Sequence, residues 1–252
     1  MKRAIMFCAT LVIAIATGFA SNVKKEYSLE SFTGINLQGP TKVFVTHGKS
    51  AVVKAEGPQE LIDKLEVYVD GSNLVIRTKK GASFKTRRDY YVQFFVEVPS
   101  LDQLAVSGSG DIILQNKMEW GSSVSMIVNG SGDLKVGQVN TQKLNLAING
   151  SGDIELKNIV STSLKAQIKG SGDLEIDGGE VLQAEYNIIG SGDIKAQSLK
   201  VDNVNASITG SGDIRCYAKK SISGKVIGSG DVVYAGKPGK VNVSKNGFSS
   251  AN

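Results

Sequence analysis

The chain has 252 residues, and its formal net charge of +5 comes from 29 lysine and arginine residues against 24 aspartate and glutamate residues. Both signs are interspersed and no basic cluster is interleaved with aromatic residues, which excludes the pattern of a nucleic-acid-binding groove. Of the two cysteines, Cys8 lies in a segment that we expect to be cleaved, so Cys216 alone remains and an intramolecular disulfide is excluded.

Residues 1–20 have the pattern of a secretory signal peptide. Lys2 and Arg3 form a charged start, residues 4–16 are apolar but too short to span a bilayer readily, and small residues precede the cleavage position. We therefore expect a mature chain that begins at Ser21 and is exported to the periplasm, the cell surface or the extracellular space. An uncleaved membrane anchor is the alternative. No transmembrane segment is expected in the mature chain.

Residues 21–100 are expected to form a β region that is continuous with the repeats described below or caps them. Pro58 favours a short helix over residues 58–64, because proline is well placed in a first helical turn. A hairpin turn is expected at residues 70–73, and Pro99 ends an aromatic strand. The expected strands cover residues 42–46, 51–55, 65–69, 74–78 and 91–98.

Charged and titratable residues of this half give weak functional signals. Lys79-Lys80 and Arg87-Arg88 are the densest basic positions, and we interpret both as part of a solvated loop. His47 is the only histidine and is expected in a turn. A single histidine supports neither an imidazole-rich metal site nor a serine triad.

The tetrapeptide Gly-Ser-Gly-Asp occurs seven times in the second half of the chain, at intervals of 22, 20, 20, 20, 20 and 18 residues. A repeat of this period is typical of a solenoid, in which each unit buries its apolar face against its neighbours. We therefore predict an all-β solenoid, similar to a parallel β-helix, over residues 101–235, with a C-terminal cap or tail over residues 236–252. The tetrapeptides begin at Gly108, Gly130, Gly150, Gly170, Gly190, Gly210 and Gly228.

Apolar and polar residues alternate on both sides of each tetrapeptide, which is the periodicity of β-strands. Each unit is expected to contain two short strands joined at the glycine corner, followed by a more variable connection. Cys216 falls at an inward position and is interpreted as a small buried hydrophobic residue. The residue after each aspartate is always apolar and is predicted to form a core column: Ile112, Leu134, Ile154, Leu174, Ile194, Ile214 and Val232.

The composition of the corner has a physical explanation. Glycine reaches positive φ without steric cost, and serine and aspartate can hydrogen-bond backbone groups that a bend leaves unpaired. Stacking identical corners at strand spacing also brings carboxylates together, with a repulsion of roughly 0.9 kcal/mol for each neighbouring pair in a water-like dielectric. Either backbone N–H donors or a cation must offset this repulsion.

Calcium is the cation to consider, because the corner is similar to the Gly-Gly-x-Gly-x-Asp repeats of calcium-binding β-rolls. The sequence lacks the paired repeats that place carboxylates on both sides of an ion, and calcium needs six or more oxygen ligands. We therefore favour a hydrogen-bonded corner without a cofactor and keep bound calcium as the alternative. The candidate ligands are Asp133, Asp153, Asp173, Asp193 and Asp213.

Three segments resemble the exported bacterial GIN domain family, described as a "putative auto-transporter adhesin" head domain and formerly as a domain of unknown function. They are Phe-Thr-Gly-Ile at 32–35, Asp-Gly-Ser-Asn-Leu-Val-Ile at 70–76, and Val-Pro-Ser-Leu-Asp-Gln-Leu at 98–104, which leads into the first tetrapeptide. The resemblance covers nearly all of the mature chain. It implies an all-β solenoid, an exported location and adhesion, and it supplies no catalytic or ligand-binding residues.

The sequence favours a non-enzymatic surface or envelope protein that binds an unidentified protein or glycan. A carbohydrate-active β-helix and a calcium-stabilised structural module are the alternatives. Trp120 lies where the repeat interval is two residues longer; it is either a sugar-stacking platform or, as we favour, a loop residue packed on the solenoid. The sequence predicts neither the oligomeric state nor the handedness of the solenoid.

Overall fold

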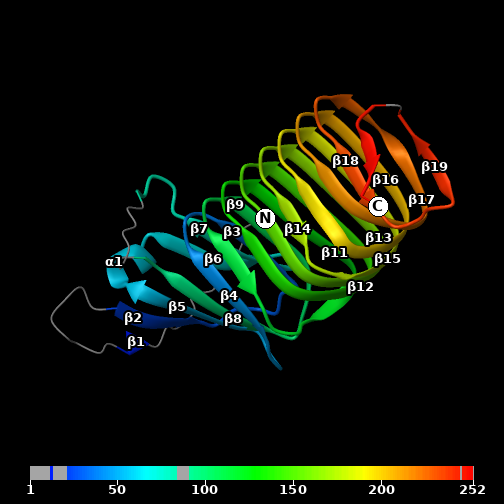
Figure 1. Cartoon of the computed structure of the whole chain (residues 1–252). Coiled ribbons are helices and arrows are strands. Elements are labelled where there is room, and N and C mark those ends of the chain that lie inside the picture. Colours follow the sequence, from blue (N-terminus) through cyan, green and yellow to red (C-terminus); the bar gives the residue numbers. More distant parts are fainter. Residues whose placement is uncertain (1–11, 14–21, 84–90, 245, 252) are drawn as a thin grey trace, which may run out of the picture.

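A computed structural model describes residues 12–13, 22–83, 91–244 and 246–251 of the chain. Most of the predicted signal peptide, Ser21 and the Arg87-Arg88 pair lie outside the described residues. The described part is all-β apart from one short helix, and its strands form one continuous 20-stranded sheet system (Figure 1). Within these ranges, no helix is both long and apolar enough to cross a membrane.

The N-terminal half begins with a small mixed sheet. β2 pairs antiparallel with β5, β5 pairs antiparallel with β8, and β4 lies parallel to β8. The two-residue strand β1 pairs with the outer edge of β2. The strands of this sheet are β1 (Val12–Ile13), β2 (Asn22–Tyr27), β4 (Lys42–His47), β5 (Val52–Pro58) and β8 (Gln93–Val98).

The remaining elements of this half lie beside that sheet. β6 and β7 form the hairpin predicted at residues 70–73, and the helix is shorter than expected, with Pro58 as its N-cap. β2 and β3 were not among the predicted strands. The bounds are β3 (Gly34–Gln38), α1 (Gln59–Ile62), β6 (Leu65–Asp70) and β7 (Asn73–Thr78).

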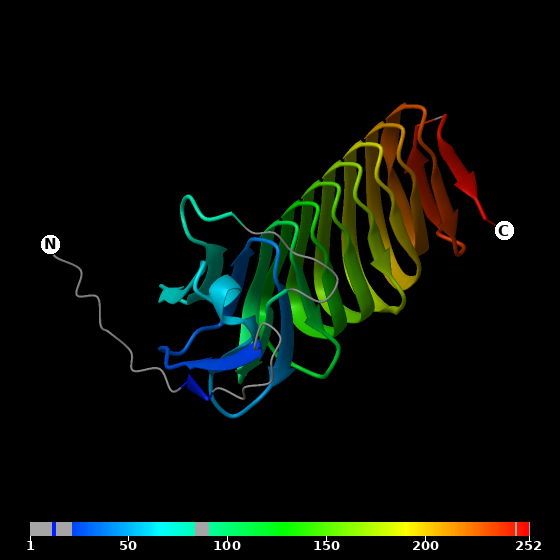
Figure 2. The same cartoon turned by 90° about the vertical axis from the view of Figure 1, so that its left-hand side faces the viewer.

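Two parallel ladders connect the N-terminal half to the repeats. β3 pairs with β9 (Ser100–Gly108), and β4 pairs with β10 (Asp111–Leu114), in the same parallel sense as the repeats pair with one another. The stack of strands therefore runs from the N-terminal sheet into the solenoid. At its other end lie β19 (Lys240–Val243) and β20 (Phe248–Ser250) (Figure 1 and Figure 2).

The second half is the predicted β-solenoid, which confirms the fold class. Successive turns pair in parallel, and the tetrapeptides align from turn to turn, as Gly130, Gly150 and Gly170 do. The strands are β9 (Ser100–Gly108), β10 (Asp111–Leu114), β11 (Glu119–Gly130), β12 (Leu134–Gly150), β13 (Ile154–Gly170), β14 (Leu174–Ile176), β15 (Gly179–Gly190), β16 (Ile194–Gly210), β17 (Ile214–Gly228), β18 (Val232–Ala235), β19 (Lys240–Val243) and β20 (Phe248–Ser250).

A turn of the solenoid differs from the two short strands expected from the sequence. β13 continues for 17 residues between corners, and its buried residues fall in three alternating stretches, 154–156, 159–161 and 164–168. Two adjacent residues remain outside the core at each interruption, where the chain bends. The pairing of β12 with β13 omits one pair of residues at each bend, 137 with 157 and 142 with 162, and resumes in the same register beyond it. We call the three stretches the first, second and third faces, in chain order.

Side chains of one kind stack inside the solenoid, as the sequence predicted. All seven residues that follow the corner aspartates are buried, and so is Cys216. In one column of the third face, Tyr186 lies between Ala166 and Ala206, and it is fully buried. The small neighbours leave room for the large ring, which keeps the core densely packed.

Candidate functional site

The Gly-Ser-Gly-Asp corner satisfies its own backbone by bonding to the corner of the preceding turn. The N–H groups of Ser151 and Gly152 both donate to the carbonyl oxygen of Gly130, at 2.9 and 3.0 Å. A Cβ on either glycine would collide with a carbonyl oxygen of the preceding turn, that of Gly130 for Gly150 and that of Gly132 for Gly152. The first glycine also has a positive φ, 142° at Gly150, as expected, whereas the second does not.

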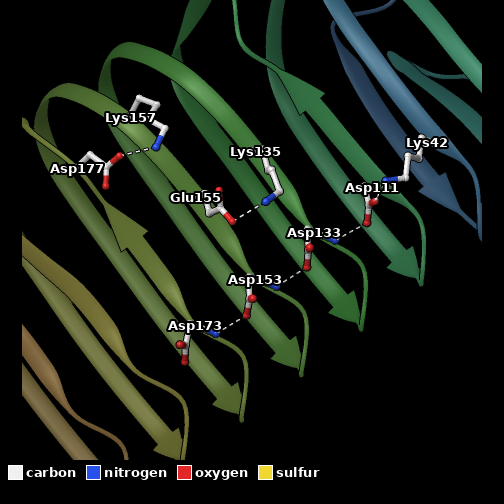
Figure 3. A network of polar contacts seen from close by, with 9 residues as sticks. All are labelled: Lys42, Asp111, Asp133, Lys135, Asp153, Glu155, Lys157, Asp173 and Asp177. Carbon is white, nitrogen blue, oxygen red and sulfur yellow. Dashed lines mark hydrogen bonds and ion pairs between the residues drawn. The ribbon is translucent and has the colours of Figure 1, made fainter.

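The corner aspartates form a hydrogen-bonded column along the solenoid, which we call the aspartate ladder (Figure 3). From Asp111 to Asp213, Oδ1 of each aspartate accepts the backbone N–H of the next, at distances between 2.8 and 3.2 Å. Lys42 pairs with Asp111 at 3.1 Å, and Lys195 pairs with Asp173 at 2.8 Å. The ladder comprises Asp111, Asp133, Asp153, Asp173, Asp193, Asp213 and Asp231.

These contacts bear on the calcium alternative. All five candidate ligands, Asp133 to Asp213, lie in the ladder, and each uses Oδ1 to hold the next turn. Among the residues that the structure describes, no three His, Cys, Asp or Glu side chains cluster so as to hold a metal ion. Each of these five carboxylates therefore accepts a backbone N–H, which reduces the repulsion along the column.

The ladder makes a pH-dependent prediction at Asp133. Burial, together with the charges of Asp111 and Asp153, raises the pKa of this carboxyl above its ordinary value, while the N–H of Asp153 and the charge of Lys135 act in the opposite direction. A raised pKa in the folded state means that Asp133 is most favourable to folding below its ordinary pKa. This advantage is lost as the pH rises through the raised value.

Asp133→Asn keeps the Oδ1 acceptor and removes the charge. We therefore expect the variant to melt at a higher temperature than the parent at neutral pH, with the difference vanishing in acid, where the parent carboxyl is protonated in both states. Thermal unfolding followed by circular dichroism across this pH range measures the effect. A variant that is less stable than the parent at every pH would contradict this account of the ladder.

A groove lies at a different bend of the solenoid, between the second and third faces. It has a volume of about 630 Å³ and runs along the axis from Trp120 in β11 to Lys219 in β17. Between these ends it crosses β12, β13, β15 and β16. At a strand spacing of about 4.8 Å, five steps give a length of about 24 Å. We call this feature the axial groove.

Trp120 forms one end of the axial groove. It lies in β11 and not in the loop expected from the sequence, next to an irregularity in the pairing between Trp120 and Ser125. The indole Nε1–H donates to the carbonyl oxygen of Gln138 at 2.8 Å, and the ring packs partly against the core. The hydrogen bond fixes the orientation of the ring at the groove.

The floor of the groove is held by buried hydroxyl groups. Oγ1 of Thr141 donates to the carbonyl oxygen of Gly121 at 2.7 Å, and Oγ of Ser161 donates to that of Gln142 at 3.1 Å. Both side chains are less than 10% exposed, at 9% and 7%. These bonds link adjacent turns across the bend and hold its shape.

Exposed side chains of three kinds stand above this floor. Amide and hydroxyl groups come from Asn140, Gln142 and Thr162, and apolar surface comes from Val160 and Leu182. Val160 is 44% exposed and Leu182 is 53% exposed, so both present aliphatic surface in the groove.

The charged groups at the other end of the axial groove are already paired. Glu180 lies 3.4 Å from the Nζ of Lys219, and Asp202 lies 2.7 Å from the Nζ of Lys220. The local charges therefore compensate one another.

The structure places the other sequence candidates away from this groove's lining. Cys216 is in the core, and burial raises the pKa of its thiol to about 12, which opposes nucleophilic chemistry. His47 is exposed at the end of β4, and Lys79 and Lys80 are exposed after β7. The aspartate ladder follows the corner between the third and first faces.

Sequence reasoning found Trp120 but missed the rest of the axial groove. The exposed residues of the groove, such as Gln142 and Thr162, lie in the variable connection between predicted strands. The alternation of apolar and polar residues assigned no strand to that connection. The available signal was the recurrence of two adjacent outward positions on each turn, seen as 162–163 in β13. That signal is visible once the inner columns are aligned by the 20-residue period.

Comparisons with known proteins support the same architecture. A "putative lipid binding protein" from Parabacteroides distasonis ATCC 8503 has a TM-score of 0.79 at 24% identity, covering 92% of this chain and 97% of that one. A "putative adhesin" from the same strain has a TM-score of 0.80 at 21% identity, covering 91% and 96%. A "putative adhesin" from Bacteroides fragilis NCTC 9343 gives 0.64 at 23% identity, covering 91% and 95%.

At these identities, the solved structures establish a shared fold. No match was found among curated proteins. The family model described as "Putative auto-transporter adhesin, head GIN domain" matches residues 31–238, which is most of the sequence. The chain therefore belongs to the GIN domain family.

Proposed function

We propose that the protein is an exported, non-enzymatic adhesion or cell-envelope binding module that holds its ligand in the axial groove. The observation that carries this proposal is the groove itself, which crosses six strands and exposes aromatic, aliphatic and amide side chains along one line. The family's adhesin description and the adhesin-like solved structures agree with a binding role. The charged N-terminal segment of the sequence supports export.

A binding role fits the side chains of the groove better than catalysis does. Its two carboxylates, Glu180 and Asp202, are each engaged with a lysine. The histidine and the buried cysteine do not line it. The carbohydrate-active alternative predicts turnover of a polysaccharide that disappears in Asp202→Asn, whereas we expect no turnover in either protein.

A groove-blocking variant tests the proposal. Thr162→Arg places a long charged side chain in the middle of the groove, and we expect it to weaken the retention of residues 22–252 on isolated cell envelopes and on immobilised glycan and protein arrays. The matched control is Gln197→Arg, which adds the same side chain at an exposed position of β16 outside the groove. Equal retention of both variants and the parent would refute the role of the groove.

The calcium-stabilised alternative predicts a different result. A ligand that binds only the folded state raises apparent stability. Because each ladder carboxylate already accepts a backbone N–H, we expect the melting temperature to be the same with calcium and with a chelator. A lower melting temperature in the chelator would favour the calcium-bound module.

A further inference from the structure

We infer that the axial groove takes a linear, uncharged polysaccharide laid along the solenoid axis, with Trp120 as a stacking platform at one end. The inference rests on the proposed function and specifies the ligand class. Four features of the described residues carry it: the paired backbone of the floor, the side-chain chemistry, the charge balance and a second depression on the neighbouring third face.

The backbone of the floor has no capacity for an added strand. β13 is paired in parallel on one side with β12 and on the other with β15, and β15 is paired in turn with β16. An extended peptide gains much of its affinity from main-chain hydrogen bonds at a free strand edge. A ligand in this groove must therefore be recognised through side chains.

Those side chains suit a ligand that carries many hydroxyl groups on apolar rings. The amides of Asn140 and Gln142 and the hydroxyl of Thr162 can each donate and accept hydrogen bonds. Val160 and Leu182 provide exposed aliphatic surface between these polar groups, which suits the C–H faces of sugar rings.

Trp120 adds a flat aromatic surface whose position is fixed before binding. Its Nε1–H is already bonded to the Gln138 carbonyl, so the ring does not have to lose rotational freedom when a sugar stacks on it. Large aromatic rings contribute apolar contact area at low conformational cost.

The charge balance selects an uncharged polymer. Glu180 is paired with Lys219 in the groove, and Asp202 with Lys220 beside it, so each carboxylate of the groove is neutralised by a lysine. An anionic polysaccharide would be repelled by these two carboxylates, and a cationic one would have to break both ion pairs.

The neighbouring third face also presents amide side chains beside the axial groove. A second depression of about 410 Å³ is lined by amide side chains, among them those of Asn145, Gln183 and Asn203, and by the ion pair of Lys165 with Glu185. Gln183 and Asn203 directly follow the groove positions Leu182 and Asp202, so substituents that project from the polymer would meet amide groups there.

The experiment is a calorimetric titration of residues 22–252 with neutral linear gluco-, manno- and xylo-oligosaccharides of increasing length. We expect affinity for at least one series to rise with length until the groove is filled, and to change little with salt concentration. Trp120→Ala should weaken binding about tenfold, and Trp120→Phe should restore part of it because the ring surface returns.

A second variant tests the groove without changing Trp120, whose replacement could also disturb the fold. Gln142→Ala with Thr162→Ala removes exposed groups whose side chains have no structural partner among the described contacts, and we expect a similar loss of affinity with unchanged melting temperature. Gln167→Ala on the third face, which lines neither depression, is the matched control and should bind like the parent.

The possible outcomes separate the two proposals. Binding to envelopes without binding to any neutral oligosaccharide overturns the polysaccharide inference and leaves the proposed function standing. Salt-sensitive binding of an anionic polysaccharide, of a protein or of lipid vesicles also overturns it. Retention on no envelope, glycan, protein or lipid surface refutes the proposed function as well.

Discussion

Replacing Gly192 by alanine is expected to lower the free energy of unfolding by about 3 kcal/mol, through steric overlap inside a packed corner. Gly192 is the second glycine of its tetrapeptide, and the added Cβ would overlap the carbonyl oxygen of Gly172 in the preceding turn. The atom in its way belongs to the backbone, so no side chain can rotate to relieve the overlap. Denaturant unfolding of the purified variant measures the loss.

The matched control lies one residue earlier in the same corner. Ser191 is exposed, and its backbone N–H, which donates to the carbonyl oxygen of Gly170 at 2.9 Å, is retained in Ser191→Ala. We expect this control to change stability by less than about 0.5 kcal/mol. If both variants were as stable as the parent, the close stacking of the corners would not explain why the second corner position is glycine.

Tyr186→Ala is expected to cost about 3–5 kcal/mol, because it leaves a large cavity in the core. Tyr186 is 1% exposed, and its neighbours in the column, Ala166 and Ala206, are too small to fill the space. Repeat proteins depend on nearest-neighbour contacts, so the loss falls on the interfaces between three successive turns. Thermal and denaturant unfolding both report it.

Tyr186→Phe separates the ring from its hydroxyl group. Among the described residues, the Tyr186 hydroxyl has no hydrogen-bond partner, and burial strongly raises its pKa. A buried unpaired polar group is unfavourable, so removing it while keeping the ring should leave stability unchanged or raise it by about 1 kcal/mol. A large loss in Tyr186→Phe would show that the hydroxyl has a partner essential to the fold.

The fold could be predicted from the sequence because identical corners recur at a nearly constant interval. The position after each aspartate is apolar in every turn, and Ile154, Leu174 and Ile194 do stack in register in the structure. Local alternation and the repeat period therefore point to the same core. The hydrogen-bonding role of the aspartates also followed from the repulsion that stacked carboxylates would otherwise suffer.

The bends could not be predicted as readily. The second and third faces are separated by positions with two outward residues in succession, and an alternating pattern treats such positions as a loop. The structure keeps them in β-strands because the parallel neighbours pair on both sides of the bend in the same register. As a result, the residues of the axial groove, such as Gln142 and Leu182, were hidden in segments that the sequence left irregular.

The second glycine was assigned correctly for an incomplete reason. Gly190 has a φ of 136°, which favours glycine, but Gly192 has no positive φ; at both positions a Cβ would collide with a carbonyl oxygen of the preceding turn. Such an approach depends on residues 20 positions away, and one corner considered alone cannot reveal it.

The constant register of the central turns bears on how this family could change in length. Residues 154, 174 and 194 are buried and lie in register with one another, so an internal duplication of one unit would add a layer that keeps this strand pairing. The solenoid would become longer by about 4.8 Å. The turn that carries Tyr186 is the least suited to duplication, because a second tyrosine would replace one of the alanines that leave room for the ring. In-frame duplication of one of the other central repeats would therefore be the simplest way to lengthen the solenoid.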